Sequence, residues 1–139
     1  MMIYTINDLK VGDSFETKTL IEEKNVETFG HITKDLNPAH FDSEYASTTM
    51  LKKRIAHGMY VGSLYSRIFG MEFPGKGSIY LGQNLKFTAP VYFNDEITTK
   101  VTVKELFIEK NRVIFECVQT NQDGNIVIKG EAVIMPPKK

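Results

Sequence analysis

Two side chains that exchange protons lie close together in the first half of the sequence. Asp35 and His40 are separated by Leu36-Asn37-Pro38-Ala39. A proline has no N–H and disfavours helical backbone at the residue before it, so this segment cannot be helical throughout. The turn that results can bring the carboxylate and the imidazole toward a common point. Such a pair can act as general acid and general base on one water molecule.

A second segment, Ile55-Ala56-His57-Gly58-Met59, opens a long apolar run. The run predicts a helix over residues 58–69, capped by Gly70, that is apolar over so much of its surface that it must be buried. The first N–H groups of a helix have no intrahelical acceptor and can bind a negatively charged oxygen. Together the two segments predict a catalytic pair that faces the start of a buried helix.

The elements that must position these groups follow from periodicity and turn residues. We expect a short strand over 14–18, a helix over 19–32 that a capping box at Thr19 and Glu22 begins, and a helical turn over 43–46. Everything after Gly77 reads as strand: 78–88, 97–104, 112–120 and 125–135. One buried helix followed by antiparallel strands predicts an α+β hot-dog fold, in which a curved antiparallel sheet wraps around a long central helix.

Length and composition restrict the classes of function. The 139 residues make one domain, 1–139, and 17 basic side chains balance 17 acidic ones, so nucleic acid is a poor candidate partner. No apolar run approaches the roughly 20 residues that span a bilayer. The single cysteine, Cys117, the absence of a signal-peptide pattern and the scattered histidines lead us to expect a cytoplasmic protein without a metal site. A core of this size also favours pairing into a homodimer.

The order of several motifs resembles that of the MaoC-like (R)-specific enoyl-CoA hydratases. The resemblance rests on Asp35-Leu36-Asn37-Pro38-Ala39-His40, Arg54-Ile55-Ala56-His57-Gly58-Met59, the stretch from Gly75 to Phe87, Ala89-Pro90-Val91 and Asp95-Glu96. It extends from about Val11 to Met135, nearly the whole chain. It implies a hot-dog homodimer that adds water reversibly, in the syn sense, to a trans-2-enoyl thioester and gives the (3R)-hydroxyacyl product. It implies no cofactor or metal.

The resemblance assigns roles by position. Asp35 and His40 match the family's catalytic pair, and Gly58 matches the glycine whose N–H binds the thioester oxygen. Ser66 matches a serine that short bacterial members carry near the pair. Arg67 and Phe69 depart from the residues common at their positions, so the shape of the acyl pocket is open.

Four residues are candidates for substrate contact, each with a plainer alternative. Asn37 either contacts substrate or only holds the turn, and His57 either contacts substrate or only bonds backbone at the helix start. Arg54, with Lys52 and Lys53, either meets the phosphates of coenzyme A or belongs to a solvated loop. Phe69 either narrows the acyl channel, which would favour short chains, or is core.

Three other functions compete with an acyl-CoA hydratase. A (3R)-hydroxyacyl-acyl carrier protein dehydratase would use the same residues and differ only in the carrier. A thioesterase would place water at the carbonyl carbon, usually with a carboxylate that has no paired histidine. A non-catalytic acyl-binding module would need neither group of the pair. The paired Asp35 and His40 favour the hydro-lyases.

Overall fold

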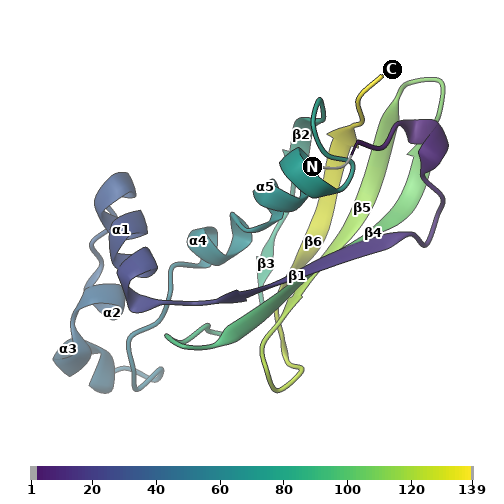
Figure 1. The fold of residues 1–139 in the computed structure, drawn as a ribbon. Helices are drawn as coiled ribbons and strands as arrows, with labels where there is room; N and C mark the ends of the chain where they lie inside the picture. The colour runs from purple at the N-terminus through teal and green to yellow at the C-terminus, as the bar shows by residue number, and fades with distance from the viewer. Residues whose placement is uncertain (1–2, 139) are drawn as a thin grey trace.

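A six-stranded antiparallel sheet forms the body of the molecule in the computed structural model, which describes residues 3–138. Its strands lie in the order β1-β4-β5-β6-β2, and β3 also pairs with β6 (Figure 1). Their bounds are β1 Ser14–Leu20, β2 Ile79–Gln83, β3 Lys86–Phe87, β4 Glu96–Phe107, β5 Arg112–Thr120 and β6 Ile126–Met135.

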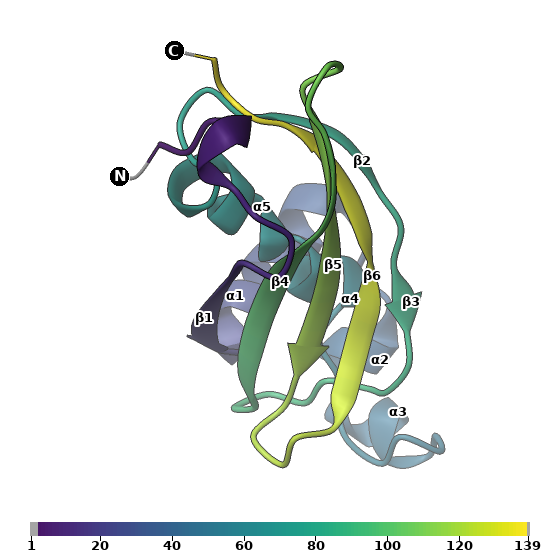
Figure 2. The same ribbon diagram turned by 90° about the vertical axis from the view of Figure 1, so that its right-hand side faces the viewer.

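The helices lie on one side of this sheet (Figure 2). A short 3₁₀-helix, η1 (Ile6–Asp8), precedes β1. Between β1 and β2 come α1 Glu23–Thr33, α2 Pro38–Phe41, α3 Ser43–Ser47, α4 Gly58–Gly62, α5 Tyr65–Arg67 and the π-helical segment η2 Ile68–Glu72. The chain from α4 to η2 is the central helical segment of the fold. The predicted α+β hot-dog architecture is confirmed.

The core lies between the central helical segment and the inner face of the sheet. Strand β5 alternates strictly between buried and accessible residues, as a strand with one covered face must. Phe115 of β5 is fully buried, and its ring lies 4.9 Å from that of Phe69 and 5.9 Å from that of Phe73, measured between centroids. These contacts fix the far end of the helical segment on the sheet.

A buried polar contact fixes the near end. Gln119 of β5 is fully buried, and its Nε2 donates to the main-chain oxygen of Val61 at 2.7 Å and to Oγ1 of Thr99 at 3.0 Å. Val61 also accepts from the N–H of Leu64, in the tighter i to i+3 pattern. The side chain from the sheet therefore takes part in the irregular turn that separates α4 from α5.

Three local predictions are wrong at their boundaries. Thr19 does not cap α1, because β1 continues to Leu20 in register with β4, and α1 begins at Glu23. Gly70 does not end the central helical segment, which widens into the π-helical turn and continues to Glu72. The strand expected over 78–88 is divided at residues 84 and 85, where the exposed Asn84 replaces regular pairing. Its N–H donates to the main-chain oxygen of Glu131 of β6, and its Oδ1 accepts from the N–H of Glu131. In each case pairing with a distant strand or packing overrides the local pattern.

Among residues 3–138, no helix has the length and apolar character needed to cross a membrane.

The inner face of β5 generates a stability prediction. Replacing Phe115 with Ala should lower the free energy of unfolding by about 3–5 kcal/mol, because it leaves a cavity beneath Phe69 and Phe73. Glu116→Ala, at the next position and on the outer face, should change it by no more than about 0.5 kcal/mol. Urea denaturation of both variants measures the difference, and equal losses would contradict this assignment of the core.

Candidate active site

A pocket of about 490 Å³ opens between the start of α4 and the chain that follows β2. Asp35, His40, His57 and Gly58 form its polar part. The rest of its wall is mostly apolar and is made by Leu51, Ile55, Ala56, Met59, Phe87, Thr88, Ala89, Pro90, Val91 and Ile128. A polar end joined to an apolar wall suits a ligand with a reactive head and a hydrocarbon tail.

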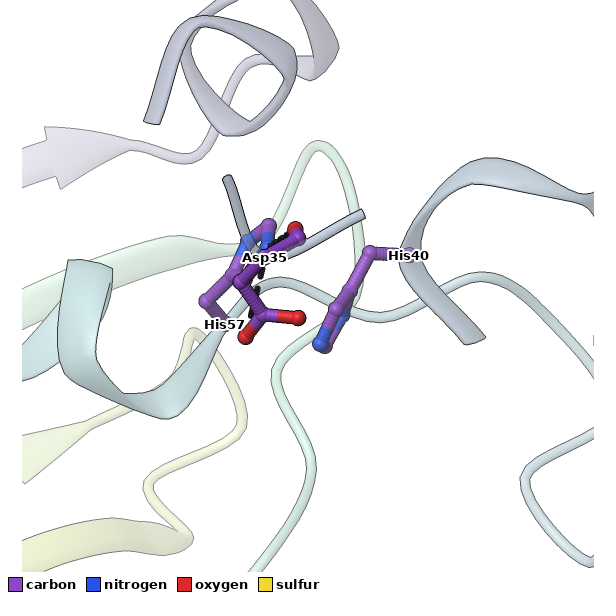
Figure 3. Close-up of side chains that lie close together, drawn as sticks. All are labelled: Asp35, His40 and His57. Carbon is purple, nitrogen blue, oxygen red and sulfur yellow. Dashed lines mark hydrogen bonds and ion pairs between the residues drawn. The ribbon is translucent and has the colours of Figure 1, made fainter. Parts of the chain in front are cut away.

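The predicted pair does converge, and a second histidine lies with it. One ligand-type atom from each of Asp35, His40 and His57 lies within 4.8 Å of the others (Figure 3). Lys34 ends α1 in the left-handed conformation, which turns the chain so that Asp35 leaves the helix axis. Asn37 then caps α2, accepting from the N–H of Ala39 at 2.9 Å, and Pro38 occupies the first helical position.

The hydrogen bond of His40 determines which ring nitrogen faces the pocket. Nδ1 lies 2.7 Å from the main-chain oxygen of Ile55. A carbonyl can only accept, so Nδ1 carries the proton and Nε2 keeps a free lone pair. A neutral imidazole with this tautomer is a base whose accepting nitrogen is Nε2.

The segment before α4 holds the backbone of His40 as well. The side chain of Arg54 is only 12% exposed, and its Nε donates to the main-chain oxygen of His40 at 2.7 Å. Its two terminal nitrogens pair with Glu23 and Glu27 of α1, at 2.6 Å and 3.3 Å. The guanidinium predicted to meet substrate phosphates is therefore engaged within the protein, where it joins α1 to the histidine segment.

Burial is the main influence on the charge of His40. It lowers the pKa of the imidazole below its ordinary value of 6.5. Neighbouring His57 and Arg54 lower the pKa further, while the hydrogen bond to Ile55 and the carboxylate of Asp35 raise it. The net shift is downward, so His40 is neutral at pH 7 and available as a base.

Gly58 is the first residue of α4 and lies at the pocket wall. An N–H at this position has no intrahelical acceptor, and none is found for it among residues 3–138. A Cβ here would come within 2.7 Å of the ring of Phe87. Glycine thus fits both the close packing and an approach of a ligand to the backbone.

The stacked rings of His40 and His57 argue against a metal centre formed with Asp35. Their centroids are 3.8 Å apart and their planes meet at only 26°. Nitrogen lone pairs lie in the ring plane, so those of two nearly parallel rings do not converge on one ion. The geometry suits proton transfer better.

The remaining predicted residues lie outside the pocket lining. Ser66 is exposed on α5, and Asn37 uses its side-chain oxygen to cap α2. Phe69 is buried in the core, with its ring 5.2 Å from that of Tyr80. Of the two roles considered for Asn37, substrate contact and holding the turn, the hydrogen bond to Ala39 fits the second.

Sequence reasoning missed the apolar wall and the contacts that hold His40. Ile55 acts through its main-chain oxygen, which no side-chain pattern reveals. Phe87 was expected only as part of a strand, yet its ring lies over Gly58. For Arg54, the acidic residues at positions 23 and 27, one helical turn apart on α1, were the available clue.

Comparison with known proteins gives the family. A family model described as "MaoC like domain" matches residues 7–125. The chain belongs to the MaoC-like family.

Individual relatives agree with this assignment. An (R)-specific enoyl-CoA hydratase of Rhodospirillum rubrum is 40% identical over 139 residues, which cover all of this chain and 96% of the relative. A 3-hydroxybutyryl-CoA dehydratase of Methylorubrum extorquens is 37% identical, with coverages of 100% and 88%. The unliganded R-hydratase of Pseudomonas aeruginosa superposes on this MaoC-like chain with a TM-score of 0.92 at 41% identity, covering 97% of this chain and 86% of that one.

The surroundings of His40 generate a prediction for this MaoC-like site. An NMR titration of the imidazole should give a pKa below 6.5, because burial disfavours the charged form. The ¹⁵N shifts should show the proton on Nδ1, where the Ile55 carbonyl holds it. A pKa above 6.5 would contradict the dominant effect of burial. A proton on Nε2 in the neutral form would contradict the assignment of Nε2 as the accepting nitrogen.

Proposed function

We propose that this protein is an (R)-specific enoyl-CoA hydratase, which interconverts a trans-2-enoyl-CoA and water with a (3R)-3-hydroxyacyl-CoA. The carrying observation is the placement of Asp35 and the free Nε2 of His40 at the polar end of an apolar-walled pocket, beside the unpaired N–H of Gly58. The relatives named as hydratases and dehydratases over the full chain support the same activity.

The two side chains act together on one water. Nε2 of His40 accepts a proton from the water as its oxygen adds to the β-carbon. Asp35 accepts a hydrogen bond from the O–H that the water keeps, and so holds the molecule in line. The proton is returned to the α-carbon, so one water supplies both the hydroxyl and the hydrogen that add across the double bond. Both groups come from one segment, 35–40, at one wall of the pocket. Addition from one face, the syn sense, follows from that placement.

Gly58 acts on the other end of the reacting system. As the hydroxyl adds, negative charge moves onto the thioester oxygen. The N–H of Gly58 donates to this oxygen, and the loss of one such donor typically costs about 2.7–4 kcal/mol of transition-state stabilisation. Ser66 remains a proposed contributor by its position in the sequence, although it is exposed on α5 and lies outside the described pocket wall.

The nearest rival function is that of an acyl carrier protein dehydratase, which differs from the proposed hydratase only in the carrier of the acyl chain. Arg54 is engaged with Glu23 and Glu27, so the exposed Lys52 and Lys53 are the remaining cations of this loop for either carrier's phosphates. Nζ of Lys53 lies 4.6 Å from the centroid of the Tyr92 ring. The neutral overall charge does not favour an acidic protein carrier, so coenzyme A is the proposed one. Comparing kcat/KM for one acyl chain on both carriers distinguishes the two.

The principal test is turnover of crotonyl-CoA. The wild-type protein should remove the enoyl absorbance without releasing free thiol; thiol release would indicate a thioesterase instead. Asp35→Asn and His40→Ala should each lower kcat by about 10²–10⁴, and the double variant should lose little more, because the two groups act on the same water. Circular dichroism checks that each variant folds. A folded His40→Ala protein with near-normal turnover would refute the mechanism.

We also propose a homodimer. One edge of the sheet is β2. This strand is largely apolar, yet its Ile79 and Leu81 are 52% and 45% exposed. An open apolar edge is a natural pairing surface. Sedimentation equilibrium at assay concentration should give twice the mass of the 15.8 kDa chain, and an active monomer would contradict the proposal.

A short acyl chain is the proposed substrate, and Phe69 is the residue proposed to limit it. Phe69→Ala should raise kcat/KM for longer enoyl-CoAs relative to crotonyl-CoA, because it empties space beside Tyr80 and Phe115. The same truncation should cost about 3–5 kcal/mol of stability, so the ratio of two substrates is the informative quantity.

Phe73→Ala is the matched control for this prediction. Phe73 is also buried and also packs against Phe115, but it lies at the end of the helical segment. It should lower stability without moving the substrate ratio. If both variants leave the ratio unchanged, Phe69 is core only.

A further inference from the structure

His57 is the most enclosed polar side chain of the pocket. It is 3% exposed, although it lies in the loop just before α4. Its ring stacks on that of His40 with the centroids 3.8 Å apart, and the ring of Phe29 lies 5.1 Å away. Phe41 approaches from the side, with a centroid distance of 6.2 Å. The imidazole is therefore held among three rings that come from α1 and α2.

This ring hydrogen-bonds the main chain at Asp35. Nε2 lies 2.9 Å from the main-chain oxygen of Asp35, and since that oxygen can only accept, Nε2 carries the proton (Figure 3). The same nitrogen is 3.9 Å from Oδ2 of Asp35, beyond hydrogen-bond distance. Among residues 3–138, the buried Nδ1 has no hydrogen-bond partner.

We infer that His57 is the positioning residue of the proposed hydratase site: its ring fixes the face of His40 while its Nε2–H fixes the main chain of Asp35. The inference rests on the proposed function. One buried side chain thus sets the distance between the two groups that share the water.

Asp35 needs such a restraint. Its side chain is 53% exposed, and the bonds of its own loop are long, 3.3 Å from Thr33 Oγ1 to its N–H and 3.3 Å from its Oδ1 to the N–H of Asn37. The bond from His57, at 2.9 Å, is shorter than both. Without it, the carboxylate would sample positions farther from the water, and an error of about 1 Å in such a group can cost about a hundredfold in rate.

A direct role in proton transfer fits less well. Nε2 of His57 is committed to a carbonyl, and Nδ1 is buried away from solvent. Contact with substrate, the other role considered for this residue, would require the ring to leave the stack on His40.

Two substitutions separate the hydrogen bond from everything else. The amide nitrogen of His57→Gln can reach the position of Nε2, whereas that of His57→Asn matches only the position of Nδ1. Both variants remove the ring and the titrating group, so they differ in the donor that reaches Asp35 and in one methylene. His57→Phe keeps an aromatic ring between Phe29 and His40 without a donor, and it preserves the packing if the smaller side chains do not fold.

With crotonyl-CoA, kcat of His57→Asn and of His57→Phe should fall about a hundredfold, with KM changed by no more than about threefold. His57→Gln should recover at least about tenfold in kcat over His57→Asn. Equal kcat values for the Gln and Asn variants would overturn the inference. So would a raised KM at unchanged kcat, which would make His57 a substrate-binding residue.

A second readout needs no substrate, and it keeps failure of the inference distinct from failure of the proposed function. The charged groups that face His40 are Asp35, His57 and Arg54, and Arg54 is paired with Glu23 and Glu27. Removing the stacked ring opens His40 to water and removes a neighbour that lowers its pKa. NMR titration of His40 in folded His57→Asn should therefore give a higher pKa than in the wild type. An unchanged His40 titration would overturn the inference, while inactivity of the wild type on every enoyl thioester would refute only the proposed function.

Discussion

The hydrogen bond between Nδ1 of His40 and the carbonyl of Ile55 is the interaction on which the rest of the site depends. The segment 54–56 also donates from the N–H of Ile55 to Ala39 and from Nε of Arg54 to His40, so α2 is held along its length. The same segment is tied to the sheet side of the molecule, through the bridge of Ile55 to Tyr92 and the bond from the N–H of Ala56 to Val91. A helix of four residues has little stability of its own. It is positioned by a strand-like neighbour that the main fold holds in place.

This arrangement also sets the chemistry of the imidazole. The carbonyl of Ile55 selects the tautomer, and burial lowers the pKa, so the nitrogen that faces the pocket is unprotonated near neutral pH. Arg54 adds a positive charge nearby, but Glu23 and Glu27 balance it. The protein thereby joins α1 to α2 through a charged side chain without leaving an unpaired charge beside the base.

The central helical segment connects the pocket to the core. Its first residue, Gly58, presents an N–H to the pocket, and its last turns pack on Phe115 of β5. Gln119, also of β5, bonds to Val61 within the segment. One continuous stretch of chain thus serves both the core and the backbone donor.

Features of the fold and the site that depend on residues close together in the sequence could be predicted from it. The turn between Asp35 and His40 depends only on residues within six positions of each other, so the convergence of the pair could be predicted. The alternation along β4 and β5 and the apolar run after Gly58 likewise predicted the hot-dog fold.

Two local signals failed because distant parts of the chain override them. Thr19 does not begin a helix, because pairing of β1 with β4 extends the strand. Gly70 does not end the helical segment, because the buried rings around Phe69 hold the chain helical beyond it. The sequence by itself determined the family, the fold class and the convergence of Asp35 with His40. Only the tertiary structure decided that Arg54 is engaged by α1, that Phe69 lies in the core, and that His57 stacks on His40, because each depends on segments brought together from distant parts of the chain.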